Sequence, residues 1–165
     1  MTSSNLPLDS VRDAKARGAN SAQSFVVQAT PRDIEQLNQE SPHGFLFVYR
    51  DSCPFCRALR TTVADLLLAM HDADLSPQQA RLYFLDTDKH GEYGRNTLGV
   101  RSVPTVFLVD QGGVRPWPDA DKVVTTRTDG AIVKTLPIDA MMQTLRALAR
   151  AKRLRDAAST ARQRQ

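Results

Sequence analysis

The sequence predicts an α/β domain, and three observations support that prediction. The chain has 165 residues, which suits one domain with terminal extensions. Hydrophobic residues make up 41% of it and charged residues 24%, as in an ordinary globular protein. Segments with the pattern of strands alternate with segments of helical spacing, in the order β-α-β-α-β-α-β-β-α. Such alternation favours parallel strands joined by right-handed helical crossovers, with the final two strands free to pair antiparallel.

Three units are expected along the chain: a flexible N-terminal arm over residues 1–23, a domain over residues 24–150, and a basic C-terminal helix or tail over residues 151–165. The arm is rich in Ser, Asn, Ala and charge, with one short helical piece at residues 9–17. No apolar segment follows its basic residues, so it does not have the form of a secretory signal. The longest apolar runs in the chain, five residues, are too short to span a membrane. A cytoplasmic protein without a membrane partner is therefore expected.

The first half of the domain has clear start and stop signals. A strand is expected over residues 24–29, followed by a helix with Thr30 as its cap and Pro31 at its first position. Residues 45–49 form a continuous apolar run, which is typical of a strand buried on both faces. Two cysteines follow, and beyond them apolar residues recur at helical spacing: Leu59, Val63, Leu66, Leu67 and Met70.

The second half continues the alternation. Further strands are expected at residues 81–85, 105–109 and 122–126. A short polar helix is expected around residues 93–98, and a turn at residues 110–113. The segment 114–121 contains two prolines and cannot be a central strand; its Trp117 is expected to pack as a loop aromatic rather than contact a partner. A last helix begins near Pro137, with a buried stripe of Ile138, Met141, Met142, Leu145 and Leu148.

Positive charge is concentrated at the C-terminus. From Arg150 onward there are six basic residues and one acid, although the whole chain has a net charge of only +4. A basic tail can attract nucleic acid or an acidic partner. The alternative is a solvated helix end, where cations also suit the helix dipole, and this alternative is favoured.

The two cysteines, Cys53 and Cys56, are the residues with the clearest chemistry. They follow a buried strand and open a helix, with Pro54 at its first position. Unpaired N–H groups and the dipole at a helix N-terminus stabilise a thiolate, the reactive form of cysteine. Cys53 is therefore expected to be an exposed nucleophile and Cys56, one turn on, a more buried resolving thiol. Arg57 adds positive potential in this first turn.

Two other interpretations of the cysteine pair remain open. A structural zinc site needs four ligands, and no second cysteine pair exists in the sequence. The three histidines, His43, His71 and His90, lie at no ligand spacing, so no metal site is expected. The pair could also lack any redox role. Its place between a strand and a helix favours redox chemistry.

The chain resembles the thioredoxin family, in its glutaredoxin-like as well as thioredoxin-like members. The resemblance rests on the CPFC motif after FLFVY, on LYFLDTD, and on YGRNTLGVRSVPTVFLVDQGG. It implies a thioredoxin-like three-layer α/β/α fold with a mixed sheet of four to five strands. It also implies a cis peptide bond between Val103 and Pro104 beside the cysteines, with Val103 pairing to an extended substrate segment. Gly130 and Ala131 resemble the small residues on the other side of that substrate groove.

The chain departs from the family pattern at several positions. Thioredoxin carries Trp-Cys-Gly-Pro-Cys, whereas Ser52 precedes the first cysteine here and the middle pair is Pro54-Phe55, closer to glutaredoxins. Thioredoxin has a buried carboxylate at the position that corresponds to Phe47, so this chain lacks that acid. Val114-Arg115 follows the Gly-Gly pair, which weakens the similarity to a glutathione site.

The resemblance implies a thiol–disulfide oxidoreductase. Cys53 would form a mixed disulfide with a substrate protein or small-molecule disulfide, and Cys56 would resolve it. No bound cofactor is expected, because the dithiol is itself the redox group; an electron-donor reductase or glutathione would return the electrons. A reducing compartment favours disulfide reduction. Two alternatives remain: a redox-regulated protein-binding module, and a nucleic-acid-associated protein that uses the basic tail.

Overall fold

A five-stranded mixed sheet forms the centre of the molecule. The computed structural model describes residues 5–110 and 112–164; position 111 of the expected turn, residues 1–4 of the expected arm and residue 165 of the expected tail lie outside these ranges. The strand order is β1-β3-β2-β4-β5. Strands β1 and β2 pair with β3 in parallel, whereas β4 is antiparallel to β2 and β5 to β4. The strands are β1 (Val26–Gln28), β2 (His43–Tyr49), β3 (Ala80–Asp86), β4 (Thr105–Asp110) and β5 (Gly113–Pro116).

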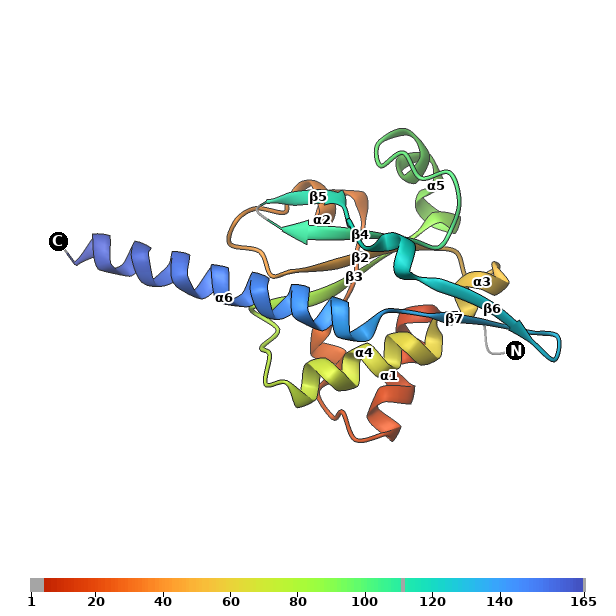
Figure 1. Cartoon of the computed structure of the whole chain (residues 1–165). Helices are drawn as coiled ribbons and strands as arrows, with labels where there is room; N and C mark the ends of the chain where they lie inside the picture. The colour runs from red at the N-terminus through yellow and green to blue at the C-terminus, as the bar shows by residue number, and fades with distance from the viewer. Residues whose placement is uncertain (1–4, 111, 165) are drawn as a thin grey trace.

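Helices cover both faces of this sheet, so the three-layer α/β/α class is confirmed (Figure 1). One face packs against a cluster that includes residues of α1 (Leu6–Ala16), α4 (Arg60–Asp72) and α6 (Ile138–Gln163). The other face packs beneath α2 (Pro31–Glu35) and α5 (Thr87–Asn96). Among the described residues, no helix is both long and apolar enough to cross a membrane.

Strand β2 is buried along its whole length and contributes side chains to both layers. Phe45, Phe47 and Tyr49 enter the cluster with α1, α4 and α6, whereas Leu46 and Val48 enter the other one. A Cβ at Gly44 would overlap the carbonyl oxygen of Arg81, so only glycine allows this close approach of β2 and β3. The continuous apolar run that predicted a doubly buried strand therefore corresponds to the central strand of the sheet.

The expected flexible arm differs from the structure. Residues 6–16 form helix α1, capped by Asn5 and packed against α4, with Leu6, Val11 and Ala14 at most 2% exposed. The 3-10 helix η1 (Ala22–Phe25) then leads into β1. Many of the buried residues in α1 are small, which is why its composition resembles that of a mobile segment.

The expected pairing of the last two strands also needs correction. Residues 105–109 were expected to pair with residues 122–126, but β4 pairs instead with β5, through the tight turn in which Gly112 has a φ of +93°. Strand β6 (Val124–Thr128) pairs with β7 (Ala131–Thr135) in a separate two-stranded sheet. Asp129 and Gly130 both have positive φ at its turn, the geometry that favours a short hairpin.

The loop between these strand pairs packs into the core, as the sequence predicts for its tryptophan. Trp117 is 4% exposed, and its ring meets Phe45 edge-on with centroids 5.0 Å apart. The 3-10 helix η2 (Ala120–Lys122) follows and leads into β6. Trp117 therefore belongs to the larger hydrophobic cluster.

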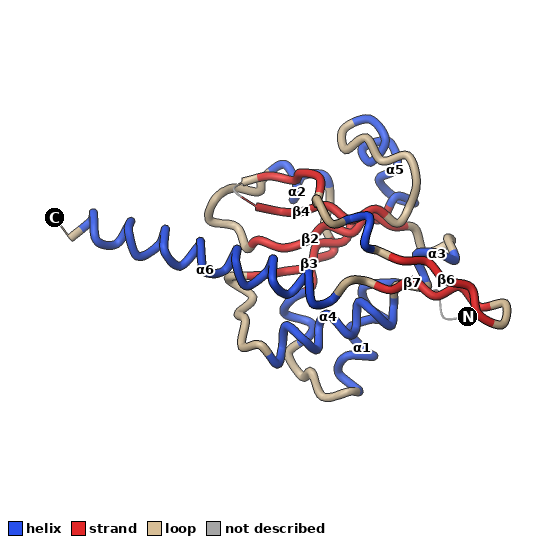
Figure 2. The backbone as a smooth tube through the Cα atoms, viewed as in Figure 1, coloured by secondary structure: helices blue, strands red, loops and turns tan. Residues whose placement is uncertain are grey.

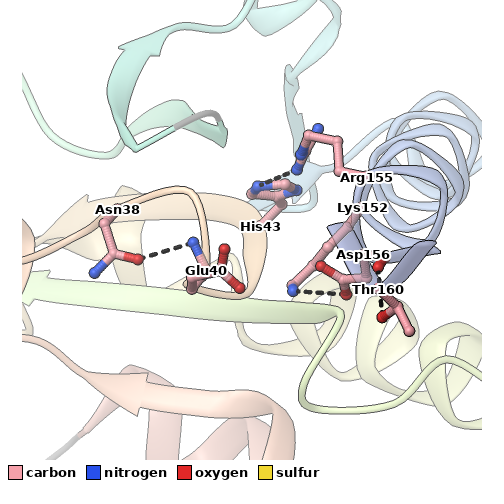
Figure 3. A network of polar contacts seen from close by, with 7 residues as sticks. All are labelled: Asn38, Glu40, His43, Lys152, Arg155, Asp156 and Thr160. Atoms are coloured by element: carbon pink, nitrogen blue, oxygen red, sulfur yellow. Dashed lines mark hydrogen bonds and ion pairs between the residues drawn. The ribbon is translucent and has the colours of Figure 1, made fainter. Parts of the chain in front are cut away.

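Helix α6 continues without a break past the boundary expected at residue 150 and projects beyond the sheet (Figure 2). Lys152 is its last buried residue, and it forms an ion pair with Asp156 at 3.2 Å. Arg155 lies 3.4 Å from Nε2 of His43, at the start of β2 (Figure 3). Burial, and secondarily the charge of Arg155, lower the pKa of His43, so the neutral ring accepts this hydrogen bond. The contact between Arg155 and His43 joins α6 to the end of the domain where β2 begins.

The packing of α1 predicts that two leucines on the same helix differ in their effect on stability. Leu6 is 2% exposed and Leu8 is 41% exposed. Replacing a buried leucine by alanine costs about 2–5 kcal/mol, and replacing an exposed one far less. We expect Leu6→Ala to lower the free energy of unfolding by that amount in urea denaturation, and Leu8→Ala to have little effect. Equal, small effects would mean that residues 6–16 are the flexible arm after all.

Candidate active site

The two cysteines lie in and just before the helix that follows the central strand β2. After β2 the chain turns, with Cys53 N–H donating to the Arg50 carbonyl at 3.0 Å. Cys53 caps the short helix α3 (Pro54–Arg57), and Pro54 takes its first position. The single helix expected after the cysteines is interrupted before α4, which begins at Arg60. Cys56 thus lies within one helical turn of Cys53, against the buried end of β2.

The two sulfur atoms have different surroundings. Both residues are thiols and are not joined by a disulfide. Cys53 was expected to be exposed, but only 8% of it is accessible; its Sγ lies 3.9 Å from the Val103 carbonyl oxygen, and the loop before Pro104 covers it. Cys56 is fully buried, and its Sγ accepts a hydrogen bond from the Arg50 N–H at 3.4 Å. Cys53 is therefore the only one of the two that can meet a second molecule without unfolding.

The electrostatic environment of Cys56 keeps it protonated in the dithiol form. Burial, with a smaller contribution from the adjacent Cys53, raises its pKa to about 12. The Arg50 N–H and the charge of Arg50 act in the opposite direction but are weaker. Because the thiolate is the nucleophile, Cys56 is inactive toward outside reagents at neutral pH.

Four of the residues expected at the site line one cavity of about 520 Å³: Cys53, Pro54, Phe55 and Val103. The Val103–Pro104 peptide bond is cis, as the resemblance implies. Arg57 does not line the cavity; its Nη1 donates to the Asp51 carbonyl oxygen at 2.9 Å.

Gly130 and Ala131 do not lie at this cavity. They occupy the turn of the β6–β7 hairpin and are exposed. Strand β5 and this hairpin both lie between β4 and α6. Gly130 and Ala131, which the sequence placed beside the substrate groove, are therefore at the tip of the hairpin. The strands of the hairpin approach the site: the charged groups of Arg127 and Lys134 each lie 5.9 Å from the ring centroid of Phe55.

Several lining residues were not identified from the sequence, and they come from segments far apart in the chain. Arg50 follows β2, Arg95 belongs to α5, and Arg101 precedes the cis bond. Gly91 and Gly94 of α5 complete this wall. A usable signal was present for Arg50, because side chains just beyond the carboxyl ends of parallel strands gather at one edge of a sheet.

A carboxylate beside the motif has a structural contact. Oδ1 of Asp51 accepts a hydrogen bond from the Leu6 N–H at 2.8 Å and so ties α1 to the cysteine loop. Burial raises the pKa of Asp51. Over residues 5–110 and 112–164, no three His, Cys, Asp or Glu residues are grouped closely enough to hold a metal ion.

Comparisons with known proteins give matches in structure but not in sequence: no family model and no curated protein matches the chain. The zinc-bound form of human ERp44 matches with a TM-score of 0.51 at 15% identity, over 74% of this chain and 30% of that one. The J-Trx1 fragment of ERdj5 matches with a TM-score of 0.50 at 17% identity, over 78% of this chain and 56% of that one. This chain thus spans about a third of the first protein and just over half of the second.

The two matches above show the fold of the protein. A mutant thioredoxin from Halobacterium salinarum also matches, at 18% identity and a TM-score of 0.48, over 76% of this chain and 89% of that one. The chain has the thioredoxin fold, and Cys53 and Cys56 are consistent with the Cys-x-x-Cys motif at the start of its first helix after the central strand.

The contrast between the two sulfurs predicts selective alkylation. At about pH 7.5 iodoacetamide should modify Cys53 faster than Cys56 by at least about a hundredfold, because Cys56 is buried and its pKa is about 12. Peptide mapping by mass spectrometry after timed quenching gives both rates. Cys56 should gain reactivity only as the pH rises toward its pKa. In guanidinium chloride the two rates should converge, and equal rates in the native protein would contradict the described site.

Proposed function

We propose that this protein is a thiol–disulfide oxidoreductase whose redox group is the Cys53–Cys56 pair. The observation that supports it best is the placement of the two sulfurs: one at a helix cap facing a cavity, the other buried beneath it. The oxidoreductase-type fold adds to this support. No bound cofactor is part of the proposal.

The proposed reaction begins with the thiolate of Cys53, the residue that caps α3. It attacks one sulfur of a substrate disulfide, forms a mixed disulfide at Cys53, and releases the other half as a thiolate that takes up a proton. Cys56 then loses its proton and attacks Sγ of Cys53, which releases the second half of the substrate as a thiol. The substrate gains two electrons, and the Cys53–Cys56 pair is oxidised to a disulfide.

Two neighbouring groups assist these steps in the proposal. The Arg50 N–H, which already contacts Cys56 Sγ, stabilises negative charge as that thiol loses its proton. The backbone at Val103, beside Cys53, pairs with an extended segment when the substrate is a protein. An external dithiol reductase or glutathione would return the pair to the dithiol form, in a cytoplasmic, reducing setting.

The proposal predicts opposite outcomes for the two serine variants. With a peptide disulfide and a dithiol reductant, the wild-type protein should turn over, and Cys53→Ser should fall to the uncatalysed rate. Cys56→Ser should still attack but fail to resolve, so a mixed disulfide should accumulate and appear as a mass adduct under non-reducing conditions.

Each variant is the matched control for the other, since both remove one thiol from the same site. An adduct on Cys53→Ser but not on Cys56→Ser would reverse the assigned roles. Absence of turnover and of any adduct would leave the fold as a binding scaffold, the alternative expected from the sequence.

A further inference from the structure

The cavity beside Cys53 is lined by three arginines and no acid. Arg50, Arg95 and Arg101 reach it from a strand end, from α5 and from the loop before the cis bond. All three are exposed. In the part of the chain that the structure describes, none of them is in an ion pair with a carboxylate. A cluster of unneutralised guanidinium groups around a nucleophile attracts anions.

Two acids of the adjoining segments accept backbone hydrogen bonds: Asp51 from the Leu6 N–H, and Asp86 from the Asp88 N–H at 2.9 Å where it caps α5. Neither these carboxylates nor those of Asp88 and Glu92 in α5 line the cavity. In the described chain, the charged groups that a ligand would meet in the cavity are therefore its arginines.

The wall formed by α5 holds one of these arginines in place. A Cβ at Gly91 would lie 3.2 Å from Nη1 of Arg95, so the guanidinium rests over the backbone of Gly91. Gly94, one turn further along, also leaves the wall without a side chain. On the opposite rim Phe55 faces the charged groups of Arg127 and Lys134, so the positive surface continues onto the β6–β7 hairpin.

We propose that this site acts on disulfides that carry carboxylates next to the reacting sulfur. The inference rests on the proposed function and names its substrate class. Arg95 and Arg101 bind the carboxylates and bring the disulfide to Cys53, because guanidinium and carboxylate groups form paired hydrogen bonds. The bonds broken and formed are those of the thiol–disulfide exchange given above: two electrons pass from the Cys53–Cys56 dithiol to the anionic disulfide, and an external dithiol replaces them.

The carboxylates can come from an acidic peptide segment or from a small acidic thiol compound. A volume of about 520 Å³ is within the range of small-molecule sites, and the cavity opens beside the Val103 backbone, where an extended peptide would pair. The shared chemistry is a carboxylate close to the disulfide, and the test separates the two sources.

The test compares three peptide disulfides of one sequence that differ only at the residues flanking cysteine: Glu, Gln or Lys. The full-length protein and a dithiol reductant are used, and kcat/KM is measured at low and high salt. Each exposed arginine–carboxylate pair contributes up to about fivefold, so the Glu peptide should exceed the Gln peptide by about tenfold at low salt. The Lys peptide should be the slowest, and salt should reduce all these differences.

A charge-matched pair of variants localises the effect. Arg95→Gln combined with Arg101→Gln should lower the ratio of kcat/KM for the Glu peptide to kcat/KM for the Gln peptide by about three- to tenfold. Arg153→Gln combined with Arg162→Gln removes the same charge from exposed positions on α6 and should change neither peptide. Glutathione disulfide serves as the small acidic compound. If Arg95 and Arg101 raise kcat/KM only for glutathione disulfide, or only for the Glu peptide, that result identifies the source of the carboxylates. Either result supports the inference.

Failure of the inference and failure of the proposed function give different results. Equal turnover of the Glu, Gln and Lys peptides, together with unchanged turnover of glutathione disulfide in the Arg95→Gln, Arg101→Gln variant, would overturn the inference while the oxidoreductase function stands. The same effect on the Glu peptide from both variant pairs would also overturn it, because net charge alone would then explain the preference. Turnover of no disulfide at all would reject the proposed function and the inference with it.

Discussion

The burial of strand β2 on both faces and both edges is the constraint on which the rest of the structure depends. Seven consecutive residues, His43–Tyr49, are buried between β3 and β4 in the sheet and between the two helical layers. Interiors packed this closely allow little movement, so the end of β2 is a fixed point. The cysteine loop begins at that point, and its position relative to the Val103 carbonyl follows from β4, which pairs directly with β2.

The difference between the two sulfurs follows from the same constraint. Cys53 caps helix α3 just beyond the end of β2, and its sulfur faces the cavity. One turn later Cys56 points back toward the end of β2 and loses all contact with solvent. Burial then raises the pKa of Cys56, while the Arg50 N–H gives its sulfur one polar contact. A single helical turn thus produces an accessible thiol and a protected one, which is the arrangement that a two-step exchange needs.

Sequence patterns predicted correctly those features that depend on a few neighbouring residues. The apolar run 45–49 and Pro54 after a cysteine each predicted a feature of the structure correctly. The cis bond before Pro104 was implied by the family resemblance. Helix α1 was expected only as a short helical piece at residues 9–17 of a flexible arm, because alanines and charged residues dominate it and only Leu6 and Val11 are large buried residues. Strand β7 was missed because it alternates half-buried and exposed positions without a partner in the main sheet.

The arginine-lined cavity could not be predicted from the sequence, for a different reason. Arg50, Arg95 and Arg101 are ordinary surface residues by sequence, and only the folded chain brings them to one cavity. The expected groove residues, Gly130 and Ala131, were misplaced because the segment after β5 includes an extra hairpin. Residues whose role depends on long-range packing carry no periodicity or spacing from which that role can be derived.

The most direct test of the central claim is a redox titration of the Cys53–Cys56 pair. The protein is equilibrated in dithiothreitol buffers and in glutathione buffers, each over a series of ratios of reduced to oxidised form. It is then quenched in acid, alkylated in guanidinium chloride so that both cysteines react, and its mass is measured by mass spectrometry. The account predicts one reversible two-electron transition between dithiol and disulfide, with about 30 mV for each tenfold change in the ratio of the two forms. It also predicts the same midpoint from either starting form. A pair that stays as two thiols across the whole range, or that oxidises only between molecules, would contradict the account.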